Sequence, residues 1–137
     1  MTFVKARIIK TLVTFFAEDY RRINHALEVL KHSEKIIETE KNYDFDIVVA
    51  VALLHDVGIK PSELEHGYNN GKYQEQYGPP AARDLLSGIN FPEEKIRIVC
   101  DIIGNHHSKS NFDYPELRIL KEADRMVNKE EMKQKPV

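Results

Sequence analysis

A chain of 137 residues, of which 42% are hydrophobic and 31% charged, has the length and composition of one globular domain, which excludes a largely disordered protein. Its formal net charge of −2 excludes a general binder of nucleic-acid polymers or of anionic membranes, because neutralising many phosphates requires a marked excess of Lys and Arg. We therefore expect a single domain spanning residues 1–137, with no nucleic-acid polymer or membrane as its partner.

The cysteine content and the apolar runs indicate the compartment. Cys100 is the single cysteine, so no internal disulfide can form, and a cytoplasmic location is expected. The first residues, MTFVKARIIKTLVTFF, resemble a signal peptide, but the apolar stretch is short and charged residues follow it at once. No run approaches the roughly 20 apolar residues that a membrane span needs.

Helical periodicity begins at the N-terminus. Apolar residues recur every three or four positions within residues 1–18, which predicts an N-terminal amphipathic helix. Asp19 is a plausible N-cap for a second, long helix that runs through His25 to about Glu40. A turn is expected at residues 42–44.

The third predicted helix starts at Asp44 or Asp46 and is apolar almost all round over residues 47–54. A helix that is apolar all round is a buried one. His55 and Asp56 end this helix, and Gly58 is expected to supply a left-handed stop.

The second half of the chain is also predicted to be helical, after an irregular segment. Residues from about Lys60 to Tyr77 are rich in Gly, Asn and Pro, which predicts a long loop beside the end of the third helix. Further helices are expected from about Pro79 to Leu86, from Pro92 at the N1 position to His106 and His107, and from Tyr114 or Pro115 to Lys129. The predicted fold is all-α, a bundle of five to seven helices with a core at about residues 19–128 and a polar tail at 129–137.

Several His and Asp residues occupy helix faces that should be buried. Asp124 falls on the apolar stripe of the last helix, His25 shares a face with Val29, and the apolar stripes of the fifth helix end at His106 and His107. Each residue alone has an ordinary explanation as a packed histidine or a helix cap. A cluster changes this interpretation, because helices of a bundle commonly build metal sites from inward-facing side chains.

The strongest candidates for one shared ion are His25, His55, Asp56 and Asp124. A buried carboxylate is costly unless it is paired or binds a metal. Two imidazoles with two carboxylates suit Fe, Mn, Co, Ni or Zn and suit Ca²⁺ poorly. Such a set leaves coordination positions open for water and substrate, which is typical of a catalytic site.

The order of these residues resembles the H…HD…D signature of the HD-domain superfamily of metal-dependent phosphohydrolases. Residues 22–25 (RINH) are similar to the R-x-x-H of that family, residues 52–58 (ALLHDVG) to its A-L-L-H-D-I-G, and residues 122–125 (EADR) to its final A-D element. The His55-Asp56 dipeptide alone would mean little. Its place inside ALLHDVG, with His25 before it and Asp124 after it at the spacing of the family signature, makes the resemblance specific. The resemblance covers about residues 19–128.

This resemblance implies an enzyme that hydrolyses a phosphate ester or anhydride of a small molecule, often a nucleotide, with a divalent transition metal. The metal would activate a water molecule, and Asp56 is the candidate catalytic residue beside it. Developing charge on phosphate oxygens needs nearby cations, for which Arg22 and Lys60 are the candidates.

The sequence departs from the family pattern in two places. Many members have H-D-x-G-K, whereas Ile59 here separates Gly58 from Lys60. Dinuclear members have a further His upstream of a G-x-x-x-A-R element, where this chain has Gln74 and Glu75. His106 and His107 match the family's later His pair, so we expect them to contact phosphate or a weaker second ion such as Mg²⁺. Glu75 is a candidate ligand or base.

Two alternatives remain at this stage. One is a dinuclear enzyme, either a dinucleoside polyphosphate hydrolase or a di-iron oxygenase. The other is a non-catalytic module that binds a phosphorylated ligand. The complete ligand set favours the phosphohydrolase, because a binding module has no physical need for four metal ligands.

Overall fold

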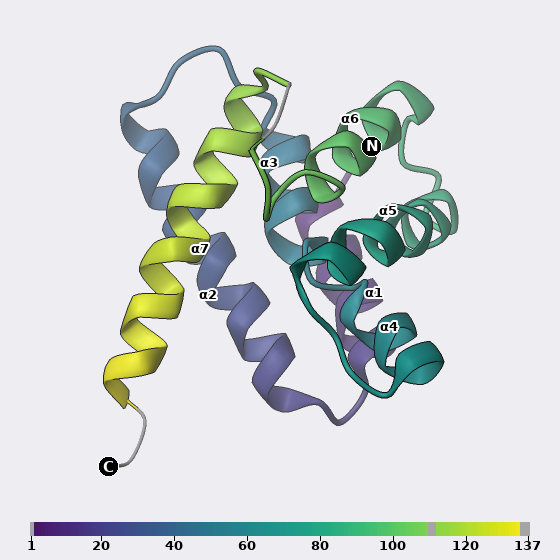
Figure 1. Cartoon of the computed structure of the whole chain (residues 1–137). Helices are drawn as coiled ribbons and strands as arrows, with labels where there is room; N and C mark the ends of the chain where they lie inside the picture. The colour runs from purple at the N-terminus through teal and green to yellow at the C-terminus, as the bar shows by residue number, and fades with distance from the viewer. Residues whose placement is uncertain (1, 110–111, 135–137) are drawn as a thin grey trace.

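The computed structural model describes residues 2–109 and 112–134, and these residues form the predicted all-α fold (Figure 1). Within the described residues there are seven α-helices: α1 (Val4–Phe16), α2 (Tyr20–Ile36), α3 (Phe45–Leu54), α4 (Ile59–His66), α5 (Gly71–Ser87), α6 (Glu93–Ile103) and α7 (Pro115–Gln134). A short 3₁₀ helix, η1 (Ile37–Thr39), extends α2. Among the helices of this part of the chain, none is both long enough and apolar enough to cross a membrane.

Helix α3 is the centre of the fold. Every residue from Ile47 to Leu54 is buried, as the apolar sequence predicts. The helix packs against α1, α2, α6 and α7, and Figure 1 shows it among these helices. Its C-terminal end therefore delivers the next residues, His55 and Asp56, into the interior of the bundle.

Helices α2 and α7 lie side by side at one edge of the bundle (Figure 1). Asp19 caps α2 as expected, because its side chain accepts a hydrogen bond from the backbone N–H of Arg22 at 3.4 Å. Helix α7 runs to Gln134 and so passes the predicted end at Lys129. Part of the predicted polar tail is therefore helical, while residues 135–137 lie outside the described residues.

The predicted loop from Lys60 to Tyr77 is wrong. Helix α4 occupies Ile59–His66 and α5 begins at Gly71, so only four residues connect them. Gly67 ends α4 in the left-handed conformation, with φ 78°, and the Asn70 side chain caps α5 by accepting from Tyr73 N at 2.8 Å. The glycines and asparagines that suggested a loop thus act as helix caps.

The predicted helix start at Pro79 is also wrong. Pro79 is typical of a helix start, but here Pro79 and Pro80 lie inside α5. Two N–H donors are lost at this point, and the Cys100 thiol donates to the Pro79 carbonyl at 3.4 Å. Helix α5 also packs against α6, the helix that carries Cys100.

Helix α6 is shorter than predicted. Pro92 precedes the helix as its cap residue instead of occupying its first turn, and the helix ends at Ile103. His106 and His107 therefore lie in the turns that follow α6. Their backbone is free of the helix geometry, which allows both side chains to approach the end of α3.

Gly58 is required for close packing and not for a left-handed stop, which corrects the expectation. Its φ is −65°, in the ordinary helical region. A Cβ at this position would lie 2.6 Å from Gly78 N and 2.7 Å from Gln74 O. The segment after α3 therefore touches the backbone of α5, and this contact fixes where α5 stands relative to His55 and Asp56.

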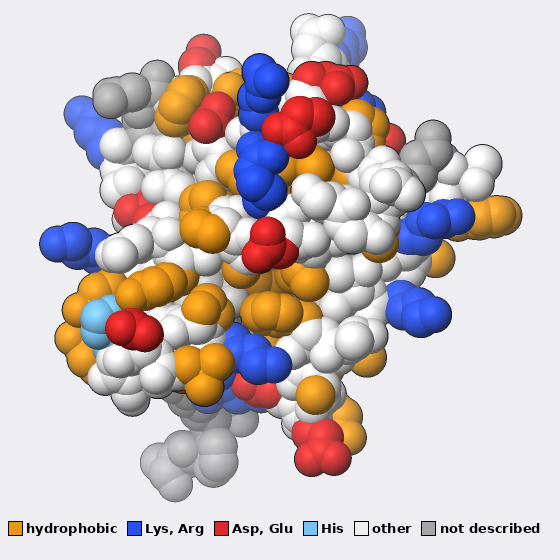
Figure 2. All heavy atoms as spheres, turned by 90° about the vertical axis from the view of Figure 1, so that its right-hand side faces the viewer, with side chains coloured by type: hydrophobic (Ala, Val, Ile, Leu, Met, Phe, Trp, Pro, Cys, Tyr) orange, Lys and Arg blue, Asp and Glu red, His pale blue; other side chains and the backbone are white. Residues whose placement is uncertain are grey.

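The face at the right of Figure 1, where α4 and α5 lie, is turned toward the viewer in Figure 2. Figure 2 shows apolar side chains on this face in several patches, with charged side chains of both signs between them. Leu64 of α4 and Tyr68, which follows this helix, are among the exposed apolar residues, with 82% and 54% of their surface accessible.

We predict that Gly58→Ala lowers the free energy of unfolding by about 1–3 kcal/mol, because a backbone contact cannot give way as a flexible side chain can. Urea unfolding would measure the change. Gly88→Ala is the matched control, since Gly88 has φ −62° and a Cβ there would meet its nearest atoms at 3.4 Å. Equal stability of the two variants would contradict the close approach.

Candidate metal centre

Three helices bring His25, His55, Asp56 and Asp124 together at one point. His25 comes from the first half of α2, Asp124 from the middle of α7, and the adjacent pair from the end of α3. His25 Nε2 lies 3.0 Å from Asp124 Oδ1 and 3.4 Å from Asp56 Oδ2. His55 Nε2 lies 3.3 Å from Asp56 Oδ2 and 3.4 Å from Asp124 Oδ1. The four side chains thus form one closed group.

The spacing of these donor atoms fits a small divalent cation. Two donors that each bind an ion at ~2.1 Å stand ~3.0 Å apart at octahedral angles and ~3.4 Å apart at tetrahedral angles. The four observed distances of 3.0–3.4 Å fall in this interval. The donor atoms of His25, His55 and Asp124 all lie within 4.8 Å of one another, and these residues can hold a metal ion.

The unpartnered nitrogen of His55 supplies independent evidence for the fit. His55 is completely buried, and its Nδ1–H donates to the Ala52 carbonyl at 2.9 Å. Its Nε2 faces the Asp56 and Asp124 carboxylates of the cluster without making a hydrogen bond, and in a neutral ring this nitrogen can bind an ion. His106 repeats this arrangement, with Nδ1 2.6 Å from the Ile103 carbonyl and an unpartnered, buried Nε2. Buried polar atoms are rarely left without a partner, so both nitrogens require one.

Electrostatics also favours a cation at this point. Burial alone would lower the pKa of His55, but the carboxylates of Asp56 and Asp124 outweigh it and raise that pKa well above its ordinary value. Burial would raise the pKa of Asp56, yet the neighbouring His55 and His106 hold it well below the usual range. The pKa of Asp124 is likewise lowered, against burial, by His25 and His55. Two buried carboxylates thus stabilise positive charge in this space.

Glu131 is a residue of the site that the sequence prediction missed. Its carboxylate lies 3.0 Å from Nδ1 of His25, so it contacts the ring on the edge away from the cluster. The sequence feature that points to Glu131 is its position seven residues after Asp124, which places both side chains on one face of α7. The sequence predicts a polar tail from residue 129, which leaves Glu131 outside the predicted site.

A second group of donor atoms adjoins the first. Asp56, His106 and His107 also place one donor atom each within 4.8 Å of one another. Asp56 Oδ1 lies 3.9 Å from His106 Nε2, while Oδ2 faces His25 and His55. The Asp56 carboxylate therefore stands between the two groups with one oxygen toward each.

The cluster opens into a cleft of about 650 Å³. Polar side chains form most of its wall: Arg21, Arg22, Asn24, His25, Asp56, Asn69, Gln74, His107, Asp124, Asn128, Glu131 and Gln134. Arg22 lines the cleft, but its guanidinium donates to Glu63 at 2.9 and 3.0 Å and to Asp19 at 3.0 Å. Its charge is therefore largely balanced by protein carboxylates.

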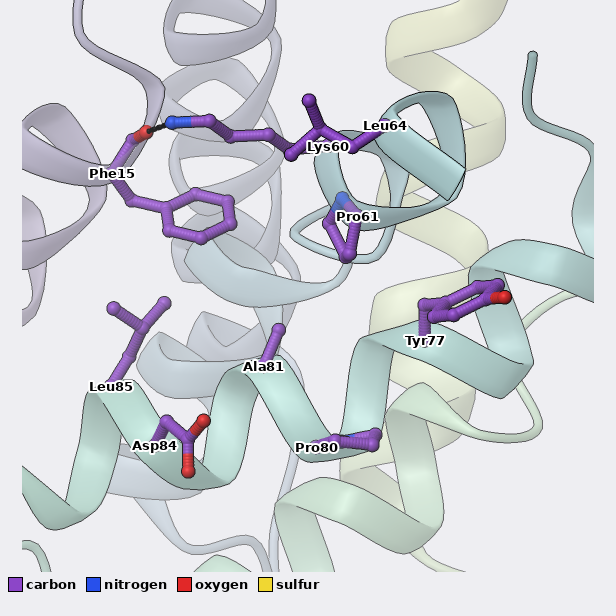
Figure 3. Close-up of a pocket in the computed structure, with 9 residues that line it drawn as sticks. All are labelled: Phe15, Lys60, Pro61, Leu64, Tyr77, Pro80, Ala81, Asp84 and Leu85. Carbon is purple, nitrogen blue, oxygen red and sulfur yellow. Dashed lines mark hydrogen bonds between the residues drawn. The ribbon is translucent and has the colours of Figure 1, made fainter. Parts of the chain in front are cut away.

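Lys60 does not line this cleft, contrary to the expectation that it contacts phosphate there. Its ammonium group donates to the Phe15 carbonyl at 2.7 Å and lies 5.0 Å from the centre of the Phe15 ring. Figure 3 shows Lys60 with Pro61, Leu64 and Tyr77 around a different, mostly apolar cavity of about 360 Å³. The reason is that Lys60 is the second residue of α4, and the direction of this helix turns its side chain toward α1.

Glu75 holds the segment that carries His107. One carboxylate oxygen accepts from the His107 backbone N–H and from the Ser108 hydroxyl, both at 2.9 Å. The His107 ring contacts the side-chain oxygen of Gln74. Glu75 is not among the residues that line the cleft, so its observed contacts are those of a support for the turn after α6.

Comparisons with known proteins agree with this geometry. The family model of the HD domain matches residues 22–129, which include all four residues of the cluster. A crystal structure of a predicted HD superfamily hydrolase from an uncultured Thermotogales bacterium is similar, with a TM-score of 0.67 and 26% identity over 87% of this chain and 65% of that chain. An uncharacterized protein of Clostridium beijerinckii is 26% identical over 96 residues, which are 69% of this chain and 58% of that protein.

The chain spans less than two thirds of the length of each of these two relatives. The family match, by contrast, extends over well more than half of this chain and includes α3 and most of α2 and α7, the helices that carry the cluster. The solved relative has the same all-α fold. On the strength of that match, this chain belongs to the HD domain family.

Proposed function

We propose that this protein is a metal-dependent phosphohydrolase that cleaves a phosphate ester or anhydride of a small molecule. His25, His55, Asp56 and Asp124 are the proposed ligands of one divalent transition metal. The observation that carries the proposal is the buried, unpartnered Nε2 of His55, which faces two carboxylates in a group with the spacing of a metal site. The adjoining cleft gives a small substrate access to this group.

The side chains around the cluster have separable roles in this reaction. A bound divalent cation would supply charge that polarises a phosphoryl oxygen and acidifies a water molecule. Asp56 presents one oxygen toward His106 and the other toward His25 and His55, so it is placed to orient that water or to accept its proton. His106 and His107 stand on the other side of Asp56, where they can contact the phosphate.

The side chains that line the cleft indicate which classes of substrate to test. Nucleotides are the first class to test, because the family resemblance implies them. No Phe, Tyr or Trp is present among the described residues that line the cleft, so a base would meet amide and guanidinium groups and the ring of His107. Sugar phosphates, whose hydroxyl groups suit the same amides, belong in the same panel of substrates.

Asp56→Ala should lower turnover of a phosphatase substrate by at least ~100-fold, because it removes a metal ligand and the group beside the water. It should also lower the Mn²⁺ content, while helical circular dichroism stays unchanged. Asp84→Ala is the control, since Asp84 lines the other cavity (Figure 3). Asp56→Asn preserves the side-chain volume in case the alanine variant folds poorly, and full activity in this variant would overturn the assignment.

His106→Ala should lower kcat by roughly 100-fold while it changes the affinity for the first metal by less than about threefold, because His106 lies outside the first group of donors. Steady-state kinetics and a metal titration measure the two quantities. His66→Ala is the matched control, since His66 stacks on Tyr73 near the other cavity. Unchanged kcat and KM would reduce His106 to a packing role.

A second candidate is a dinuclear enzyme, and the shared position of Asp56 between two donor groups favours it. In this case Asp56, His106 and His107 would hold a second, weaker ion. Metal analysis of the purified chain distinguishes the two functions. We expect one ion per chain after extensive dialysis, whereas two retained ions would establish the dinuclear form.

A further inference from the structure

We propose that Glu131 is a positioning residue of the metal centre, which fixes the His25 ring so that Nε2 points into the cluster. This inference rests on the proposed metal function. The Glu131 carboxylate lies 3.0 and 3.2 Å from Nδ1 of His25. It accepts a hydrogen bond from Nδ1–H, so that in a neutral ring the lone pair lies on Nε2, the atom 3.0 Å from Asp124 Oδ1.

His25 needs such a distant partner because of its place in the helix. His55 and His106 follow the ends of α3 and α6, and their Nδ1 atoms bond to the carbonyls of Ala52 and Ile103. These carbonyls are free because the last turn of a helix leaves four of them without an intrahelical partner. His25 lies inside α2, where neighbouring carbonyls are used by the helix. Its orientation must therefore come from another element.

Helix α7 is that element, and it carries two carboxylates on one face. Asp124 and Glu131 are seven residues apart, close to two helical turns. Asp124 contacts Nε2 of His25 at 3.0 Å, and Glu131 contacts Nδ1 at 3.0 Å. The imidazole is thus held on both edges by one helix, and the packing of α2 against α7 sets its plane.

Glu131 cannot bind the same ion as the cluster, because it lies on the opposite edge of the His25 ring. A surface ion pair is the other explanation, since 40% of the Glu131 side chain is exposed. The two explanations differ in what they predict. An ion pair would affect only the stability of the protein, whereas a positioning residue changes the affinity for the metal.

The test is a titration of the full chain with Co²⁺, followed by calorimetry and by the visible absorption of the bound ion. Glu131→Ala removes the acceptor, and Glu131→Gln keeps an oxygen that can accept the Nδ1 proton. Glu130→Ala is the matched control, because Glu130 contacts His32 at 3.3 Å across the same pair of helices. Thermal unfolding of each metal-free variant measures the effect on stability separately.

We expect Glu131→Ala to weaken the tight Co²⁺ binding by roughly 10- to 100-fold and to alter the absorption spectrum. Glu131→Gln should recover part of the affinity, and Glu130→Ala should leave the tight binding unchanged. Wild-type affinity and spectrum in Glu131→Ala would overturn this inference and leave the proposed function intact. Failure of the wild-type chain to bind Co²⁺ tightly would overturn the proposed metal centre and this inference with it.

Discussion

Burial of two carboxylates at the end of the most apolar helix is the constraint on which the rest of the site depends. Asp56 and Asp124 each have less than a fifth of the side chain exposed, beside the completely buried His55. Removing such charges from water costs several kcal/mol unless opposite charge compensates for it. The imidazoles provide part of this compensation, and a divalent cation would complete it. An apolar core therefore surrounds a point that attracts positive charge.

The imidazoles are oriented by two different physical means. His55 and His106 use carbonyls that a helix end leaves free, so their orientation is local and follows from where α3 and α6 stop. His25 depends on α7, more than a hundred residues away in the chain. The integrity of the site is thus coupled to the packing of α2 against α7, and the C-terminal turns of α7 belong to the functional unit.

The cationic side chains predicted to bind phosphate, Lys60 and Arg22, are engaged by other groups of the protein. Lys60 bonds to the end of α1, and Arg22 is balanced by Asp19 and Glu63. Under the proposed function, the phosphate of a substrate would therefore meet the cation at the cluster, Arg21 and the polar groups of the cleft. A strongly basic pocket is unnecessary when a metal carries the positive charge, which agrees with the near-neutral composition of the chain.

Short-range patterns in the sequence determined the all-α class and the buried α3, because helical periodicity is local. The sequence also supplied His25, His55, Asp56 and Asp124 as candidate ligands, through polar residues on apolar helix faces and the ALLHDVG segment. Tertiary structure alone decided the direction of Lys60, the role of Gly58 and the contact of Glu131 with His25. Helix α4 and the first part of α5, residues 71–78, also escaped prediction, because Gly and Asn act as caps or as loops depending on what packs beside them. Side-chain direction depends on how helices cross, and periodicity within one helix carries no information about that crossing.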